Sequence, residues 1–474
     1  LISKAHINGQ WVDAQSGAVY PITNPADGSV LGEVPDMNEH DTQQAIAAAE
    51  AALPGWRSKT AGERYKVLMR WFELIHENGD DLAKLMTLEQ GKPLAEAKGE
   101  VIYGAAFLQW FAEEGKRVYG DVIPTPANDR RILAIKQPVG VTAMITPWNF
   151  PLAMLTRKAG AAIAAGCTVV SKPAKETPLT ALAFAELGQQ AGLPDGVFNI
   201  ITTKKPVPVG NAITQNPVVR KLSFTGSTGV GKRLVADCAV TMKKVSMELG
   251  GNAPFIVFDD ADLDAAVEGA LASKYRNSGQ TCVCANRFLV QDGVYDEFAE
   301  RFMKTVKELK VGPGLEGNNQ GPLINEAAID KVESLVADAT TKGASALCGG
   351  KRHALGGTFY EPTILTNVDD RMACMQEEIF GPVAPLMRFH EEEEAIQLAN
   401  DTPYGLAAYF YARDIGRIWR VSEALEYGMV GVNQGIISTE VAPFGGVKES
   451  GLGREGSKYG IDEYLEIKYL CMGI

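Results

Sequence analysis

Two thiols separated by one residue stand near the middle of the chain, in the segment SGQTCVCANR (278–287). Cys282 and Cys284 could be half of a metal site, a disulfide, two core cysteines, or a nucleophile with a neighbour. A zinc site needs about four ligands, usually in pairs spaced by two to four residues. The chain has no second cluster of cysteine or histidine, and its five histidines are scattered. The spacing therefore argues against a metal.

The residues around Cys282 favour chemistry over packing. A free cysteine is usually a core residue, but the run GQT before Cys282 predicts a polar loop at the end of a helix. A loop between α/β elements is a common place for a reactive group. No histidine lies in a motif, so a carboxylate would have to act as the base. The candidates are Glu248 in SMELGGN and Glu377 or Glu378 in QEEIFGP.

A glycine-rich turn, SFTGSTGVGKRL (223–234), follows a predicted strand and opens a predicted helix. It differs from a phosphate-binding P-loop because Arg233 replaces the hydroxyl residue that would hold Mg²⁺. The order of Gly226, Gly229 and Gly231 also departs from G-x-G-x-x-G. These departures argue against a nucleotide hydrolase. Backbone N–H groups at such a turn still suit a phosphate, although a tight turn without a ligand fits the glycines equally well.

The elements that must position these residues alternate between strands and helices. Residues 61–114 have helical periodicity, and the segment from Arg131 to about 225 alternates short β-favouring runs with helices, one of them over Lys158–Ala165. A second alternating region begins near Gly250. This pattern predicts an α/β protein with parallel sheets. The last residues, DEYLEIKYLCMG, predict an extended segment that needs a sheet to join, which hints at an oligomer.

Composition limits the function further. With 474 residues, 46% of them apolar and 22% charged, the chain has the make-up of an ordinary globular protein of several domains. Its net charge of −12 argues against nucleic acid or an anionic membrane as the main partner. Seven cysteines without a framework of spacings fit a reducing compartment, so we expect a cytoplasmic protein that acts on a small molecule.

Seven stretches together resemble one family, the aldehyde dehydrogenases that use a nicotinamide dinucleotide. They occur in the family's order: PWNFP (147–151), SKPAKETP (171–178), FTGST (224–228), MELGGN (247–252), GQTC (279–282), EEIFGPV (377–383) and PFGGVKESGLGREG (443–456). The resemblance implies a dinucleotide-binding α/β domain (1–120 and 138–249) and an α/β catalytic domain (250–441). It also implies a small β bridging element (121–137 and 442–474) that joins subunits into dimers or tetramers.

The resemblance also implies a covalent mechanism. Cys282 would attack the aldehyde carbon as a thiolate and form a thiohemiacetal. The side-chain amide of Asn149 and the backbone N–H of Cys282 would stabilise the oxyanion. After hydride transfer leaves a thioester, Glu248 would activate the water that hydrolyses it. Lys158 is a further catalytic candidate.

For the cofactor, the family's pattern implies contacts that lie away from the usual Rossmann fingerprint. The implied residues are Thr146, Trp148, Lys172, Ala174, Lys175, Gly226, Ser227, Leu249, Glu378 and Phe380. NAD-preferring relatives often carry glutamate where this chain has Lys175. A lysine would attract the 2′-phosphate of NADP, so we expect NADP over NAD, with NAD possible.

Three polar residues set the expected substrate. Arg157, Arg276 and Ser438 would converge on a carboxylate, and these positions match the succinate-semialdehyde dehydrogenases, which this chain resembles. Succinate semialdehyde is therefore expected, with glutarate semialdehyde or a broader range of aldehydes as alternatives, because one methylene discriminates weakly. In this subgroup Cys284 can form a disulfide with Cys282, which would make it a redox partner. A non-catalytic relative and an enzyme that ends on coenzyme A are the competing hypotheses.

Overall fold

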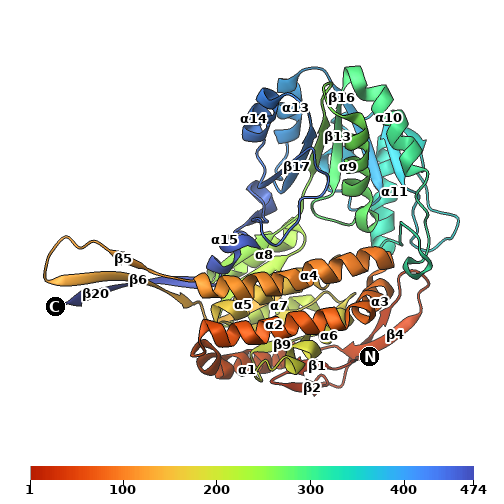
Figure 1. Cartoon of the computed structure of the whole chain (residues 1–474). Helices are drawn as coiled ribbons and strands as arrows, with labels where there is room; N and C mark the ends of the chain where they lie inside the picture. Colours follow the sequence, from red (N-terminus) through yellow and green to blue (C-terminus); the bar gives the residue numbers. More distant parts are fainter. Residues whose placement is uncertain (1) are drawn as a thin grey trace.

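The computed structural model describes residues 2–474 and contains two large sheets, a three-stranded sheet and a hairpin (Figure 1). The first large sheet has eight strands, and its central five run parallel. In spatial order they are β19 (Gly451–Leu452), β11 (Lys244–Glu248), β10 (Val219–Thr225), β7 (Val141–Ile145), β8 (Thr168–Lys172), β9 (Phe198–Ile200), β1 (Ala5–Ile7) and β2 (Gln10–Val12).

Helices cover both faces of this sheet, because its central strands are apolar on both sides. In β7, Met144 belongs to one core and Ala143 to the other. The first core packs under α2 (Ala61–Glu77), α3 (Gly79–Gln90), α4 (Leu94–Glu114), α5 (Ala153–Ala165) and α6 (Pro178–Gln190). The second packs under α1 (Glu39–Arg57), α7 (Pro206–Gln215) and α8 (Thr228–Ala239).

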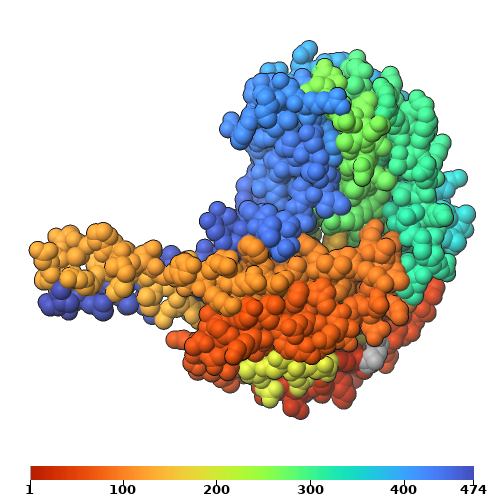
Figure 2. Space-filling model, viewed as in Figure 1, coloured from red at the N-terminus to blue at the C-terminus, as the bar shows by residue number. Residues whose placement is uncertain are grey.

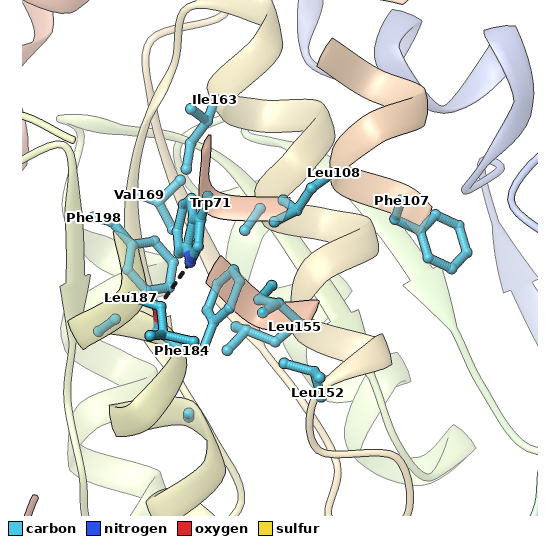
Figure 3. Packing of buried hydrophobic residues seen from close by; sticks show 14 of the residues in the cluster. Trp71, Phe107, Leu108, Leu152, Leu155, Ile163, Val169, Phe184, Leu187 and Phe198 are labelled. Atoms are coloured by element: carbon cyan, nitrogen blue, oxygen red, sulfur yellow. Dashed lines mark hydrogen bonds between the residues drawn. The ribbon is translucent and has the colours of Figure 1, made fainter. Parts of the chain in front are cut away.

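Trp71 of α2 stands at the centre of the first core (Figure 3). Its indole stacks on Phe184 with ring centroids 4.1 Å apart, and its N–H donates to the Phe184 carbonyl at 3.0 Å. This hydrogen bond lets a polar ring atom be buried without a desolvation cost. The core therefore ties α2 to α6 and, through Phe198, to the sheet.

The second large sheet has seven strands, all parallel except β14. In spatial order they are β14 (Ser345–Cys348), β15 (Thr363–Thr366), β16 (Val383–Phe389), β13 (Ala285–Gln291), β12 (Ala253–Val257), β17 (Ala407–Tyr411) and β18 (Met429–Val432). One face packs on α9 (Leu263–Tyr275) and α10 (Asp292–Val306). The other packs on α11 (Glu326–Thr341), α12 (Ala373–Gln376), α13 (Glu392–Asn400) and α14 (Ile415–Ala424).

The three-stranded sheet forms an arm that extends away from the rest of the chain (Figure 2). Its strands are β20 (Leu465–Gly473), β6 (Arg130–Pro138) and β5 (Asp121–Ile123), and the short α15 (Ser457–Asp462) precedes β20. β20 pairs with β6 over the whole length of both strands. The extended segment expected at the end of the chain thus finds its sheet within the same chain. The remaining hairpin is β3 (Val19–Thr23) with β4 (Val30–Pro35).

The predicted α/β class is confirmed, and the element boundaries differ in places. The helix expected over Lys158–Ala165 begins five residues earlier, at Ala153, because the turn in the PWNFP motif leads directly into it. The predicted division into domains stays a prediction. Gly451–Leu452, inside the predicted bridging segment, pairs with β11 of the eight-stranded sheet. None of the helices in residues 2–474 is both long and apolar enough to cross a bilayer.

Candidate active site

The functional residues gather where the two large sheets meet end to end. Asn149 follows β7 and Glu248 ends β11, whereas Cys282 precedes β13 and Glu378 precedes β16. The carboxyl ends of the first sheet therefore face the amino ends of the second. Loops from both sheets line one cavity of about 280 Å³, which includes Asn149, Cys282, Glu378 and Phe380.

A left-handed corner places Cys282 in this cavity. After α9 ends, Asn277, Ser278 and Gly279 have φ values of 52°, 55° and 77°. Left-handed backbone is costly for residues other than glycine, and the surroundings hold it in place. The Asn277 side chain accepts from Gln90 at 3.0 Å, and the Ser278 hydroxyl donates to the Gly321 carbonyl at 2.9 Å. The corner is thus fixed by residues from distant parts of the chain.

The Cys282 side chain is only partly exposed to water. Burial raises its pKa to about 12, against the opposing effect of Arg157. Nearby Glu378 and Glu248 raise the pKa further. In this environment the sulfur is a neutral thiol at neutral pH, so a base has to take its proton before it can act as a nucleophile.

Glu248, at the end of β11, is one candidate for that base, and Glu378, which lines the same cavity as Cys282, is another. Both oxygens of Glu248 are buried, and neither accepts a hydrogen bond from any residue of the described chain (2–474). Burial raises its pKa well above the ordinary value, and the negative charge of Glu455 raises it further. A raised pKa makes the carboxylate a stronger base.

Lys158 and Arg157 both form ion pairs with Glu455, whose charge acts on Glu248. The Glu455 carboxylate contacts the Lys158 ammonium and the Arg157 guanidinium, and Lys158 also donates to the Ser223 hydroxyl at 3.0 Å. All three charged groups are buried. The two cations outweigh burial and hold the pKa of Glu455 below its ordinary value. Glu455 is therefore the negative partner that the two cations share.

A second cavity, of about 280 Å³, brings Arg276 and Ser438 together. The Arg276 guanidinium lies 4.9 Å from the centre of the Phe150 ring, which also lines this cavity. Phe150 follows Asn149, which lines the Cys282 cavity, and Arg276 is near enough to lower the pKa of Cys282. Arg157 does not line it, because its guanidinium is held by Glu455 and lies 4.4 Å from the Phe444 ring centre. Of the three residues expected to bind the substrate carboxylate, the structure thus brings Arg276 and Ser438 together but not Arg157.

A third cavity, of about 490 Å³, lies at the carboxyl ends of β7, β8 and β10 and holds most of the residues expected to contact a dinucleotide. Its lining includes Thr146, Trp148, Lys172, Ala174, Lys175, Gly226 and Ser227, and Leu249 lines the first cavity. Ser227 is the N-cap of α8, and its side chain makes no capping hydrogen bond. The free N–H groups at this helix start suit a phosphate.

Lys172 supports the same fit. Burial lowers its pKa to about 8, and within the described residues 2–474 its ammonium donates only to the neighbouring Pro173 carbonyl at 3.1 Å. A buried ammonium with a single carbonyl partner retains the capacity to bind a ligand hydroxyl. Lys175 is more exposed and lies 3.9 Å from Glu176. The donors and the volume of this cavity fit a nicotinamide dinucleotide.

Glu378 and Phe380 line the first cavity, which shares Trp148, Gly226 and Ser227 with the third. The Glu378 carboxylate accepts from the Gly251 N–H at 3.0 Å, and burial raises its pKa to about 7. Phe380 has a φ of 56°, and its ring meets Trp148 edge-on with centroids 5.6 Å apart. A phenylalanine in left-handed backbone is strained, and such strain is concentrated at functional sites.

Hydrogen bonds fix both the backbone and the side chain of Asn149. Its carbonyl accepts from the Lys92 ammonium at 2.7 Å and from the Asn277 side chain at 3.0 Å. Its side-chain amide donates to the Gln280 carbonyl at 2.9 Å. One amide N–H is thereby used, and the second is free for a ligand.

Cys284 lines none of the three cavities. It is buried, and its thiol donates to the Lys274 carbonyl at 3.3 Å. All seven cysteines of the chain are free thiols in this structure. The side chains of residues 2–474 form no group of three histidine, cysteine, aspartate or glutamate residues arranged to hold a metal ion.

Sequence reasoning missed Glu455 and the cavity residues of α4. Glu455 lies inside the quoted motif GREG, and an acid among glycines was the signal that could have drawn attention to it. Glu96 and Tyr103 line the Arg276 cavity from α4. They lie on a long amphipathic helix, where nothing local distinguishes them from surface residues.

Comparisons with known proteins agree with this geometry. A family model described as "Aldehyde dehydrogenase family" matches residues 11–470. A succinate-semialdehyde dehydrogenase [NADP(+)] of Escherichia coli is 63% identical over 472 residues, covering 99% of this chain and 98% of the relative. A glutarate-semialdehyde dehydrogenase of Pseudomonas aeruginosa is 62% identical over 471 residues, covering 99% and 97%. The crystal structure of an E. coli NADP-dependent enzyme has a TM-score of 0.99 at 63% identity, covering 100% of this chain and 98% of that one.

The corner before Cys282 can be tested with two glycines. A Cβ on Gly279 would lie 2.1 Å from the Gly381 carbonyl oxygen, whereas Gly317, with a similar φ of 74°, has open space around it. Left-handed backbone costs alanine about 1–2 kcal/mol, and the clash adds about 1–3 kcal/mol. Urea unfolding should show Gly279→Ala losing about 2–5 kcal/mol, and Gly317→Ala only the backbone share. Equal losses in the two variants would contradict the proposed packing.

Proposed function

Because this chain belongs to the aldehyde dehydrogenase family, we propose that it oxidises succinate semialdehyde to succinate, with NADP as the preferred cofactor. The observation that carries the proposal is the cavity in which Arg276 and Ser438 adjoin the Cys282 site. A guanidinium and a hydroxyl there would bind the carboxylate of the substrate and leave its aldehyde near the sulfur. The names of the E. coli and P. aeruginosa relatives, both enzymes of ω-carboxylate semialdehydes, support this substrate class.

In this proposal Cys282 is the nucleophile and Glu248 the base. Glu248 takes the thiol proton, and the thiolate adds to the aldehyde carbon to form a thiohemiacetal. The free amide N–H of Asn149 and the backbone N–H of Cys282 stabilise the oxyanion. Once Cys282 carries the acyl group as a thioester, Glu248 activates a water for hydrolysis. Lys158 acts indirectly, because with Arg157 it holds the negative charge of Glu455, which acts on the pKa of Glu248.

NADP would occupy the 490 Å³ cavity and, when bound, supplies the hydride acceptor. Lys172 and Lys175 would hold its adenosine end, and the start of α8 with Gly226 and Ser227 its pyrophosphate. Thr146, Trp148, Ala174 and Leu249 would provide the apolar and backbone walls. Glu378 and Phe380 would hold the nicotinamide end beside Cys282.

Glutarate semialdehyde is the alternative substrate, since one methylene changes binding by only about 1–3 kcal/mol. A homo-oligomer, dimer or tetramer, is part of the proposal. The arm exposes apolar side chains such as Val122, Ile467 and Tyr469, which a second copy would cover. We further propose a cytoplasmic location, in keeping with seven free thiols.

The substrate assignment predicts a selective effect of Arg276→Gln. Losing a charge-assisted contact to the substrate carboxylate costs about 1.5–3 kcal/mol, so KM for succinate semialdehyde should rise about 10- to 100-fold. KM for butanal, which lacks the carboxylate, should change less than about two-fold. Arg220→Gln, an exposed arginine at the far end of β10, is the matched control, and Cys282→Ala should abolish turnover of both aldehydes. Parallel changes for the two aldehydes in Arg276→Gln would contradict the assignment.

The cofactor assignment predicts that Lys175→Glu reverses the preference. A glutamate repels the 2′-phosphate and accepts from the 2′-hydroxyl, so kcat/KM with NADP relative to NAD should fall about ten-fold or more. Initial rates with each cofactor measure this ratio. Lys66→Glu makes the same change of charge on an exposed face of α2 and should leave the ratio unaltered. An unchanged ratio in Lys175→Glu would mean that another group selects the cofactor.

Cys284 is proposed to be a redox partner of Cys282. Its burial on the Lys274 side means that the loop has to move before the two sulfurs can meet. Peroxide treatment should then give an inactive protein with a Cys282–Cys284 linkage that dithiothreitol reverses, and Cys284→Ala should lose the reversible part. Cys471→Ala, an exposed thiol on the arm, is the control. Loss of activity without this linkage in the peptide masses would rule the switch out.

A further inference from the structure

The cavity proposed to bind a carboxylate also contains two carboxylates of the protein, Glu96 and Glu100. Both lie on α4, one turn apart, and both are largely withdrawn from water. A negative ligand that enters this cavity meets their charges as well as that of Arg276. How far each glutamate is neutralised therefore decides how strongly an anion binds there.

Glu100 is fully compensated. It forms a buried ion pair with the Lys92 ammonium, and its other oxygen accepts from the N–H groups of Leu152 and Ala153 at 3.0 and 3.1 Å. One cation and two N–H donors satisfy its charge. It therefore adds little net repulsion toward a ligand.

Glu96 is compensated much less. Its carboxylate accepts from the Asn277 N–H at 2.7 Å, and no ion pair joins it to a lysine or arginine within the described residues 2–474. Burial raises its pKa, and the positive charges of Lys92 and Arg276 act in the opposite direction. Arg276 is thus part of the positive field on which Glu96 depends, and it is also the group that a substrate carboxylate would use.

Resting on the proposed function, we infer that Glu96 is a specificity-determining counter-charge, which competes with bound carboxylates for Arg276 and so weakens their retention. Its hydrogen bond to Asn277 N–H fixes it next to Arg276 at the start of the left-handed corner. The repulsion matters most for the product. Oxidation converts a substrate with one negative charge into succinate with two, so a fixed negative charge favours release of the dicarboxylate over retention.

The effect is of moderate size by Coulomb's law. Two unit charges roughly 8 Å apart at an effective dielectric constant of about 40 repel by about 1 kcal/mol, which corresponds to about a five-fold change in affinity. Glu96→Gln removes the charge and keeps a carbonyl oxygen that can accept from Asn277 N–H. Succinate should then bind the protein about five-fold more tightly. Glu113→Gln, near the opposite end of α4 and outside the cavity, removes the same formal charge and serves as the control.

The experiment is calorimetric titration of succinate into the free protein, for the wild type and for Glu96→Gln, Glu113→Gln and Arg276→Gln. The expected order of affinity is Glu96→Gln above wild type, Glu113→Gln equal to wild type, and Arg276→Gln below it. In kinetics, kcat/KM for succinate semialdehyde relative to butanal should rise about five-fold in Glu96→Gln. This ratio separates an effect on the anion from a general effect on the loop.

The two proposals fail in different ways. Unchanged or weaker succinate binding in Glu96→Gln, with the expected loss in Arg276→Gln, overturns the role of Glu96 and leaves the substrate assignment standing. Unchanged binding in Arg276→Gln overturns the carboxylate site itself. Glu96→Ala repeats the test without a hydrogen-bond acceptor. Tighter succinate binding by Glu96→Ala supports the counter-charge role of Glu96, even if the loop before Cys282 is loosened. Weaker succinate binding by both Glu96 variants contradicts that role.

Discussion

The site depends on one tight backbone contact, where the left-handed corner at Gly279 lies against the Gly381 carbonyl. α9 packs on the second large sheet. After this helix the chain has to reverse sharply so that Cys282 faces the carboxyl ends of the strands of the first large sheet. Gly381 lies one residue after Phe380, whose strained backbone forms the opposite wall. The nucleophile and the wall of the proposed cofactor site are therefore positioned by the same contact. Strain at Asn277 and Ser278 is held by hydrogen bonds to α3, α4 and the loop at Gly321.

Burial of charge is the second constraint. Cys282, Glu248 and Glu378 all have pKa values raised by burial. Burial disfavours the charged form of each group, which makes the two carboxylates stronger bases than they would be in water. Glu455 is the exception, because two cations keep it ionised. Its fixed negative charge in turn helps to keep the pKa of Glu248 high.

An acidic protein that handles an anionic substrate has to create a positive region locally. With a net charge of −12, the chain offers no long-range attraction to a carboxylate. The proposed site instead uses Arg276 in a cavity whose other charges are either paired, as in Glu100 with Lys92, or opposed to the ligand, as in Glu96. Such a site selects a carboxylate at a defined distance from the sulfur. It holds that carboxylate only moderately, which suits an enzyme that has to release a more negative product.

By itself, the sequence determined the fold class, the family and the nucleophile, because each is encoded in contiguous residues. Strand and helix alternation, the glycine-rich turn before α8 and the run GQTC are all local patterns. The tertiary structure alone decided which charges share a cavity. In the sequence nothing distinguishes Arg157 from Arg276 as a ligand for a carboxylate. The fold pairs Arg157 with Glu455, almost three hundred residues further along the chain, whereas Arg276 lines a cavity. Glu96 sits on an ordinary amphipathic helix, and only the packing of α4 against the corner at Asn277 brings it to that cavity. Partnerships of this kind arise where distant segments cross, so no local pattern of residues can encode them.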